Sequence, residues 1–170
     1  MKNINNFINE KLGENSLKPK TTDELKKIIN ARIKTDGDDC DLNDIDVSAI
    51  TNMRGVFYES YFNGDISEWD VSNVTNMSLM FEKSKFNGDI SEWDVSKVTD
   101  MTEMFYKSKF NKDISNWDVS NVIKMAGMFN GSDFNQNIRN WDISNVKDNL
   151  GMFTNSPIDN VKTKLPYFNK

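Results

Sequence analysis

Aspartate returns in this sequence at a fixed interval, which raises the question of what a row of carboxylates could do. We call this set the aspartate row: Asp46, Asp70, Asp94, Asp118 and Asp142. Closely spaced carboxylates can act as general acid and base, hold a cation, or receive the Lys and Arg side chains of a partner. Neighbouring carboxylates about 5 Å apart also repel by on the order of 1 kcal/mol in a watery setting, so something must offset that cost.

Two interpretations of the aspartate row remain open from the residues alone. In the structural one, each Asp accepts a hydrogen bond from a backbone N–H or a Ser hydroxyl within its D-V-S triplet. In the functional one, the row binds Lys and Arg of a partner, or a cation. The flanking acids Glu68 and Glu92 become Asn in later copies, so the negative charge is strongest early in the chain. The candidate partner-binding residues are Glu68, Asp70, Glu92, Asp94, Asn116, Asp118, Asn140 and Asp142.

Several kinds of chemistry are excluded by composition. The chain of 170 residues has no histidine and one cysteine, Cys40. Without histidine, the sequence lacks the usual general base, the usual zinc ligand and every Ser-His or Cys-His pair. A single thiol cannot form an internal disulfide. We therefore predict no catalytic residues, no metal site and no cofactor.

The charge balance indicates the kind of partner. The net charge is −5 and the isoelectric point about 4.8, which argues against direct nucleic-acid binding and favours a protein with a basic surface. No apolar run approaches the roughly 18 residues of a membrane span. Residues 1–20 lack the apolar centre of a signal peptide. We expect a cytoplasmic protein if Met1 is the native start, and a secreted or cell-surface one if the chain has been shortened. The sequence gives no indication of oligomeric state.

The large apolar side chains follow the same 24-residue step. Residues 65–88 and 89–112 share 18 of 24 positions. The aromatic series are Trp69, Trp93, Trp117 and Trp141; Phe57, Phe81, Phe105, Phe129 and Phe153; and Phe62, Phe86, Phe110 and Phe134. One such copy cannot bury its apolar face alone, but stacked copies can. These side chains are therefore predicted to form the core.

The pattern within a copy predicts a repeat solenoid. Trp69 and Val71 would share one face of a short extended segment, with Asp70 on the other. Met77, Met80 and Phe81 have a spacing that suits one helical or 3₁₀ turn. We therefore expect an α/β repeat solenoid, right-handed and of the leucine-rich-repeat type. It would have five 24-residue turns, a short parallel β-sheet and an N-terminal helical cap.

The ends of the chain are expected to close the stack. Residues 21–34, TTDELKKIINARIK, predict a helix that begins with a capping box of Thr21 and Glu24 and lies across the first turn. Residues 3–12 could form another short helix, and Ile158, Val161, Leu165, Tyr167 and Phe168 could cover the far end. The expected division is 1–40 for the cap and an acidic linker, 41–160 for the five-turn solenoid, and 161–170 for the C-terminal cap.

The acidic linker DGDDCDLND, residues 36–44, is predicted to be a solvated turn. A calcium loop counted from Asp36 would need Gly at its sixth position and Glu at its twelfth, and those places hold Asp41 and Val47. We expect Cys40 to be a small, half-buried residue of this turn.

The repeated phrases FNGDISEWDVSNVTNMSLMF and FNKDISNWDVSNVIKMAGMF resemble the BspA-like leucine-rich-repeat proteins of bacteria and mycoplasmas. The resemblance covers residues 41 to about 155. It implies a repeat protein that acts by binding, often at the cell surface as an adhesin, and it implies no catalysis.

Three functions follow as hypotheses. The first is a non-enzymatic protein–protein interaction module that presents an acidic solenoid face to a basic partner. The second is a small intracellular inhibitor or immunity-type protein, which a phage could encode, that blocks a basic or nucleic-acid-binding enzyme surface. The third, a hydrolase with paired carboxylates, fits least, because carboxylates on a repetitive open face lack a unique desolvated cleft.

Overall fold

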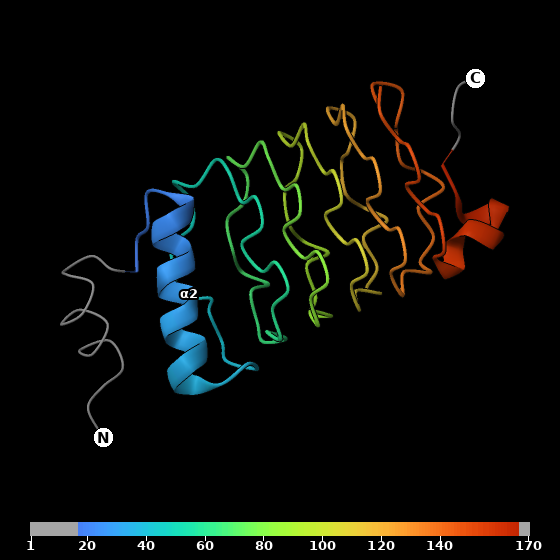
Figure 1. Ribbon diagram of the computed structural model, residues 1–170. Helices are drawn as coiled ribbons and strands as arrows, with labels where there is room; N and C mark the ends of the chain where they lie inside the picture. The colour runs from blue at the N-terminus through green and yellow to red at the C-terminus, as the bar shows by residue number, and fades with distance from the viewer. Residues whose placement is uncertain (1–16, 167–170) are drawn as a thin grey trace.

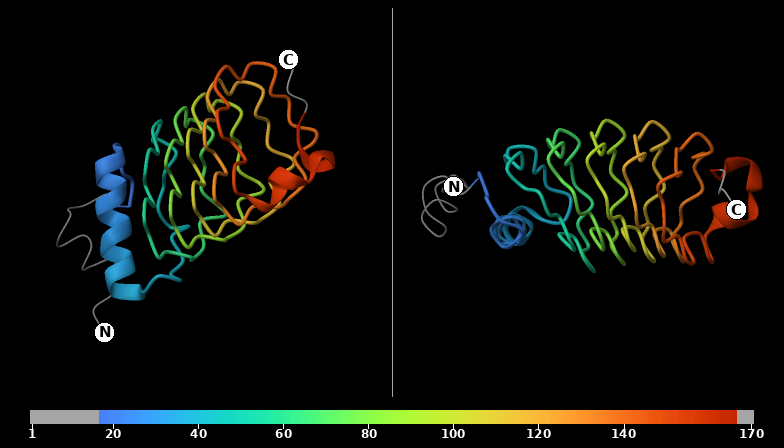
Figure 2. Two further views of the ribbon diagram at one scale, coloured as in Figure 1. Left: turned by 45° about the vertical axis from the view of Figure 1, so that its right-hand side comes forward. Right: turned by 90° about the horizontal axis from the view of Figure 1, so that it is seen from above.

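The computed structural model describes residues 17–166 as a stack of similar turns closed at each end by helical segments (Figures 1 and 2). Successive turns lie side by side with equivalent residues 24 positions apart, as in the hydrogen bonds from Thr75 to Thr51 and from Thr99 to Thr75. The register is also marked by isolated parallel bridges: Asn52 to Asn76, Asn76 to Asp100, Asp100 to Lys124, Lys124 to Asp148, and Asp41 to Asp65. The repeat in the sequence is therefore a repeat in space.

The expected α/β solenoid of leucine-rich-repeat type with a parallel β-sheet is wrong. Within residues 17–166, parallel pairing is confined to those isolated bridges, and α2 (Thr22–Asp36) is the sole α-helix. Extended pairing fails at the predicted strand because the chain bends on both sides of Asp70. Trp69 N–H bonds to the Ile66 carbonyl and Val74 N–H to the Val71 carbonyl, so two tight turns flank that residue.

The helical or 3₁₀ turn predicted at Met77, Met80 and Phe81 also takes another form. We call this segment, residues 77–84 and its equivalents in the other turns, the arm. Alternate N–H groups of the arm, from Met77, Leu79, Phe81 and Lys83, donate to carbonyls of the next turn at 2.7–2.9 Å. The N–H groups between them close turns within the arm, as Met80 does to Met77. Leu79 and Lys83 have φ of 60° and 55°, so neither a helix nor a regular strand can form.

The core consists of the aromatic columns that the sequence predicts. Phe57, Phe81, Phe105, Phe129 and Phe153 are buried, and adjacent rings lie 5.4–6.0 Å apart and nearly parallel. The second Phe column, from Phe62 to Phe134, has ring spacings of 6.1–6.3 Å. Met101, Met104 and their equivalents fill the space around the rings. Each turn thus buries its apolar side chains against the turns on either side.

Tryptophan contributes both burial and a hydrogen bond between turns. Trp69, Trp93 and Trp117 are only 3–4% exposed, which confirms the prediction that the indoles lie inside. Each indole N–H donates to a carbonyl 27 residues earlier; Trp93, for example, bonds to Ile66 at 3.1 Å. A buried carbonyl is thereby satisfied without a sheet.

Helix α2 covers the first turn, as predicted. Thr21 accepts the Glu24 N–H at 3.2 Å, while the Glu24 carboxylate accepts the N–H of Lys20 rather than that of Thr21. Leu25, Ile28 and Ile29 are buried against the stack. Helical spacing would place Arg32 in this apolar stripe, but its guanidinium is paired with Asp36 at 3.0 Å and Asp44 at 2.8 Å. This pairing fixes the acidic linker against the helix.

The far end is covered by two short 3₁₀ segments, η1 (Pro157–Asn160) and η2 (Lys162–Lys164). Ile158 is fully buried and Leu165 packs against the core, as predicted for a cap. Tyr167, Phe168 and the helix expected at residues 3–12 lie outside the described residues. No helix in residues 17–166 has the length and apolar character to cross a membrane.

The tryptophan hydrogen bond can be tested with Trp93→Phe. The substitution keeps an aromatic ring but removes one of the two donors to the Ile66 carbonyl, which retains the Trp69 N–H, and also removes part of the packed volume. We expect the free energy of unfolding to fall by about 2–4 kcal/mol. Met101→Leu, which conserves volume at another buried position, should cost less than about 1.5 kcal/mol. Urea denaturation measures both, and equal losses would show that the indole N–H contributes nothing specific.

Two equivalent arm positions have a left-handed backbone but hold Lys in one turn and Gly in the next. We predict that removing the Gly lowers the stability of the fold and that introducing Gly at the other position does not. Gly131 has φ of 66°, and its equivalent one turn earlier, Lys107, has φ of 52°. Gly131→Ala should lower the free energy of unfolding by about 1–2 kcal/mol, because a Cβ is unfavourable there and would lie 3.1 Å from Lys107 Cγ. Lys107→Gly should be neutral or stabilising. Thermal unfolding of both variants checks this, and destabilisation by Lys107→Gly would contradict it.

Candidate functional site

The aspartate row lies at a corner of each turn, where it closes a local bend. In all five copies, Oδ1 of the Asp accepts the N–H of the Ser two residues later at 3.0–3.2 Å. The Ser48 and Ser120 hydroxyls donate to the same oxygens of Asp46 and Asp118 at 2.6 Å. The structural interpretation of the D-V-S triplet is thus confirmed. The second carboxylate oxygen of Asp46 lies 3.6 Å from Lys18 Nζ, whereas Asp70, Asp94 and Asp118 form no ion pair within residues 17–166.

A second row of aspartates, which the sequence reasoning missed, lies five residues before the first. Its members are Asp41, Asp65, Asp89 and Asp113, and they bind the N–H two residues later at 2.8–2.9 Å. Asn137 does the same for Arg139 in the last copy. The signal was present in the repeated D-I-S triplet, which has the same Asp-x-Ser form and recurs at the same interval as D-V-S.

A tight turn joins the two rows and projects the glutamates. Trp69 N–H bonds to the Ile66 carbonyl at 3.3 Å, and Glu68 lies at the tip of that turn. Asn43 fixes the tip through a 2.9 Å bond from the Glu68 N–H to its Oδ1. The buried Trp69 ring anchors the turn below. We call each such unit, residues 65–70 and its equivalents, an acidic corner.

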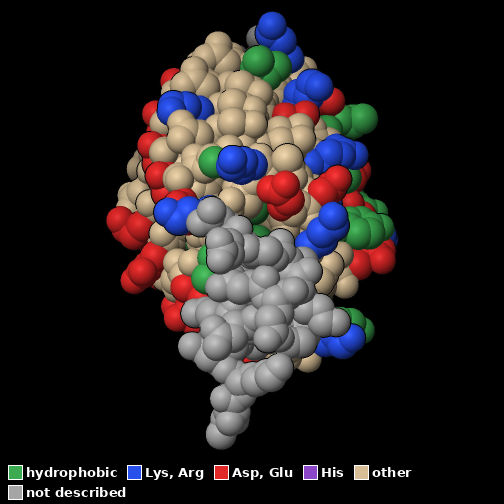
Figure 3. Space-filling view, turned by 90° about the vertical axis from the view of Figure 1, so that its left-hand side faces the viewer, with side chains coloured by type: hydrophobic (Ala, Val, Ile, Leu, Met, Phe, Trp, Pro, Cys, Tyr) green, Lys and Arg blue, Asp and Glu red, His purple; other side chains and the backbone are tan. Residues whose placement is uncertain are grey.

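All eight predicted partner-binding residues are exposed, and they lie on these corners rather than on the strand face that the sequence pattern predicts. Successive corners are neighbours: one shallow groove is lined by Asp89, Glu92, Lys112, Asp113 and Asn116, from two adjacent turns. Figure 3, which looks along the stack from the end of α2, shows acidic side chains gathered along one rim of the molecule. Corners of adjacent turns therefore form a mainly acidic edge, whose negative charge is weakest at the last corner, where Asn137, Arg139 and Asn140 replace acidic or neutral residues of the earlier copies.

Hydrogen bonds to the acidic corners lower the pKa values of several carboxyls. The hydroxyl and backbone N–H of the following Ser lower the pKa of Asp46, Asp94 and Asp142. The backbone N–H and then the hydroxyl of Ser67 and Ser91 lower the pKa of Asp65 and Asp89. These bonds stabilise the charged form of these five carboxyls.

Another edge of the stack, with Lys83, Lys85, Lys107 and Lys109, carries charges of both signs. Lys83 pairs with Glu59 at 3.0 Å and Lys109 with Asp133 at 3.0 Å, each with the equivalent region of an adjacent turn. These exposed pairs link neighbouring turns and contribute little to stability individually.

The carboxylates of the acidic linker do not gather into a metal-ligand cluster in the part of the chain that the structure describes. Across residues 17–166, no group of three or more His, Cys, Asp or Glu side chains is arranged to hold a metal ion. Cys40 is buried more completely than expected, at 9% exposure, and burial raises the pKa of its thiol. The Cys40 carbonyl lies so close to Gly64 that a Cβ there would come within 1.9 Å of it, which explains the glycine.

Comparison with known protein families gives one finding that bears on this site. The family described as "Mycoplasma protein of unknown function, DUF285" matches residues 24–131 and, in a second match, residues 106–164. The chain belongs to this family. Two overlapping matches agree with the repeated turns of this DUF285 protein, and together they include most of α2 and every acidic corner. No curated protein and no solved structure matches the chain.

The acidic corners of this DUF285 protein predict a loss of stability in acid. A carboxyl whose pKa is lowered by folding stabilises the folded state above its unfolded pKa of about 3.9, and this contribution disappears as the pH falls through the folded value. Asp94→Asn keeps the acceptor oxygen but cannot titrate, so stability should fall less steeply below about pH 4. Asp94→Ala loses the bend as well and should cost about 0.5–1.5 kcal/mol at neutral pH. Unfolding measured from pH 7 to 2 distinguishes the three proteins, and identical pH profiles would contradict the assignment.

Proposed function

We propose that this DUF285 chain is a BspA-like, non-enzymatic protein-binding module whose acidic corners dock on a basic surface of a partner protein. The observation that carries the proposal is the arrangement of the two aspartate rows. One oxygen of each of four exposed aspartates, Asp65, Asp70, Asp89 and Asp94, holds the local backbone bend, and no ion pair within residues 17–166 occupies the other. The side chains of Glu68 and Glu92 project between the rows.

Pre-organisation supports the proposal. A carboxylate that is already held by an N–H group loses little conformational freedom when a Lys or Arg binds to it, so more of the interaction energy remains as affinity. Arg can form bidentate bonds to a carboxylate, which adds geometric specificity. Because the corners recur at regular intervals, a partner with several spaced cations could engage several of them at once.

Electrostatics support a basic partner. The corners carry two Asp and one Glu per turn in the turns that contain Glu68 and Glu92, against a net charge of −5 for the whole chain. A mainly acidic edge steers an oppositely charged partner and accelerates association at low ionic strength. The resemblance of the repeated phrases to BspA-like proteins supports binding, in an adhesin-type role, as the activity of this surface.

The proposal predicts that neutral corners abolish partner capture. The variant E68Q/D70N/E92Q/D94N removes four charges, and the new Asn residues keep an Oδ1 acceptor for the Ser N–H groups, so the corners should stay folded. When the purified chain is used to capture proteins from its source cells, we expect quantitative mass spectrometry to show at least about tenfold less of the partner with this variant. The wild-type interaction should also weaken at high salt.

A matched control removes the same number of charges elsewhere. The variant D38N/D39N/E103Q/D159N has the same net charge as the corner variant but leaves the acidic corners unchanged. It should capture the partner as the wild type does. Equal capture by the corner variant and the wild type would eliminate the corners as the binding surface. Equal losses in both variants would show that net charge alone causes the loss of capture.

A further inference from the structure

The first turn of the stack has an unpaired edge beside α2. In the second turn, the carbonyls of Ser78, Met80 and Glu82 accept N–H groups of the first turn at 2.8–3.0 Å. The equivalent carbonyls of the first turn belong to Arg54, Val56 and Tyr58. Within residues 17–166, no hydrogen bond reaches any of these three carbonyls, because α2 occupies the place of a preceding turn. An edge of unused backbone acceptors is a template for another chain.

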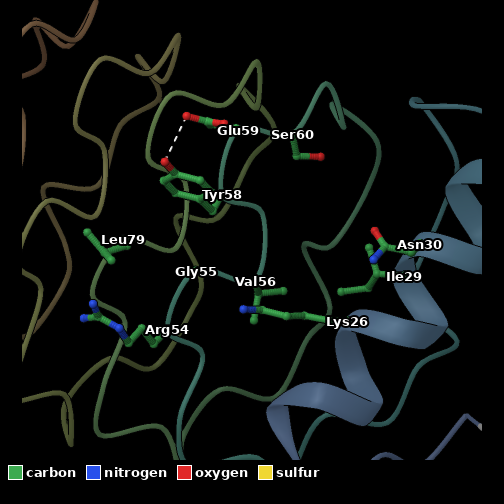
Figure 4. Close-up of a pocket in the computed structure, with 10 residues that line it drawn as sticks. All are labelled: Lys26, Ile29, Asn30, Arg54, Gly55, Val56, Tyr58, Glu59, Ser60 and Leu79. Carbon is green, nitrogen blue, oxygen red and sulfur yellow. Dashed lines mark hydrogen bonds between the residues drawn. The ribbon is translucent and has the colours of Figure 1, made fainter.

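The unpaired edge lines an open groove with a volume of about 600 Å³. Lys26, Ile29 and Asn30 of α2 form one wall, and the chain from Arg54 to Ser60 forms the other (Figure 4). In Figure 4, the Lys26 side chain extends from the helix toward Val56. The volume lies within the range of ligand-binding clefts.

The groove is electropositive although the protein is acidic. Arg54 donates to the Ser78 hydroxyl at 2.9 Å, and among the described residues neither Arg54 nor Lys26 makes an ion pair. The one carboxylate of the lining, Glu59, is already bound by Lys83 at 3.0 Å and by the Tyr58 hydroxyl at 2.9 Å. Two cations without counterions therefore favour an acidic occupant.

We propose that this groove binds one acidic segment of a partner protein, whose alternate N–H groups donate to the carbonyls of Arg54, Val56 and Tyr58. The segment has the backbone conformation of an arm, because in every later turn an arm donates to the equivalent carbonyls. Two residues four positions apart then need positive φ, as Gly127 and Gly131 have, and as Leu79 and Lys83 have in another turn, so Gly is the residue most easily accommodated at these places. This surface is separate from the acidic corners.

A whole turn of a second copy does not meet these requirements. Helix α2 lies across the end of the first turn, with Thr22 Oγ1 bonded to the Asn52 carbonyl at 2.6 Å, so a complete turn cannot stack there (Figure 1). The last arm of the chain, residues 149–156, contains no charged residue and therefore has no charge to match the groove. Both points favour a single acidic segment.

The alignment of equivalent residues in neighbouring turns indicates where the acidic side chain of the bound segment would lie. Arg54 contacts Ser78, its equivalent in the next turn, and Ser78 directly precedes the donor Leu79. By the same relation, the ligand residue that precedes its first donor lies beside Arg54. A carboxylate at that position would lie close to Lys26, whose Nζ is 3.7 Å from where a Gly55 Cβ would be, and would meet the guanidinium once the exposed Arg54 side chain turns from Ser78 toward the groove.

Synthetic arms test the proposal against the full chain. The probe is a fluorescent peptide that copies residues 124–132, KMAGMFNGS, with A126E, and the matched control peptide has A126K. We expect fluorescence anisotropy to show at least about tenfold tighter binding of the Glu peptide. N-methylation at the Phe129 nitrogen, the donor to the Val56 carbonyl, should weaken binding by at least about tenfold, whereas N-methylation at residue 126, which is not a donor, should not.

Protein variants complete the test. Arg54→Ala, a change at an exposed side chain, should reduce the affinity for the Glu peptide to that for the Lys peptide, and Lys85→Ala, outside the groove, should leave it unchanged. The proposal is overturned if no peptide binds at millimolar concentration, if the two peptides bind equally, or if N-methylation at Phe129 has no effect. Self-association of the full chain that Arg54→Ala abolishes would assign the groove to a second copy and also overturn it.

Discussion

Each turn of this protein depends on its neighbours both for burial and for hydrogen bonding. A single turn has aromatic rings on one side and N–H groups that no local partner can satisfy. The next turn supplies both needs: it covers the Phe and Trp rings and offers its carbonyls to the arm. The indole of each Trp adds a bond in the opposite sense along the chain. Since no regular sheet within residues 17–166 supplies these bonds, side-chain oxygens of Asp, Asn and Ser hold the corners, which accounts for the many such residues on the surface.

The sequence predicts the parts of this fold that follow from periodicity and capping. The regular interval of the repeat identifies the core columns, and Thr21 marks the start of α2. The D-V-S triplet predicts its own bend because Asp and Ser close such bends locally. The prediction covers only part of each acidic corner, since Asp65 and Asp89 follow the same rule in D-I-S and were missed. Helical spacing alone places Arg32 in an apolar stripe, because nothing in the sequence shows that Asp36 and Asp44 converge on it.

The sequence alone could not rule out a parallel sheet, because it does not show which residues have a left-handed backbone conformation. Leu79, Lys83, Glu103 and Lys107 have positive φ, yet nothing about these residue types indicates it. Only the glycines at the equivalent positions of other turns, Gly55, Gly127, Gly131 and Gly151, indicate it. A Trp-x-Val alternation of two residues is also too short to specify a strand, and the bends on either side of Asp70 override it. Backbone strain at repeated positions is sustained here because the bonds from both neighbouring turns fix the arm.

The stacked interior has a consequence for how such a protein can change length. An interior turn meets nearly identical surfaces on both sides, while α2 contacts the first turn and η1 the last. Duplication or deletion of one repeat unit in the gene would therefore join matching surfaces and leave both end caps undisturbed. The protein would lengthen by whole repeat units, and every added unit would bring its own pair of aspartates to the same rim. The length of the surface that contacts a partner could in this way change without any change in the residues that make each contact.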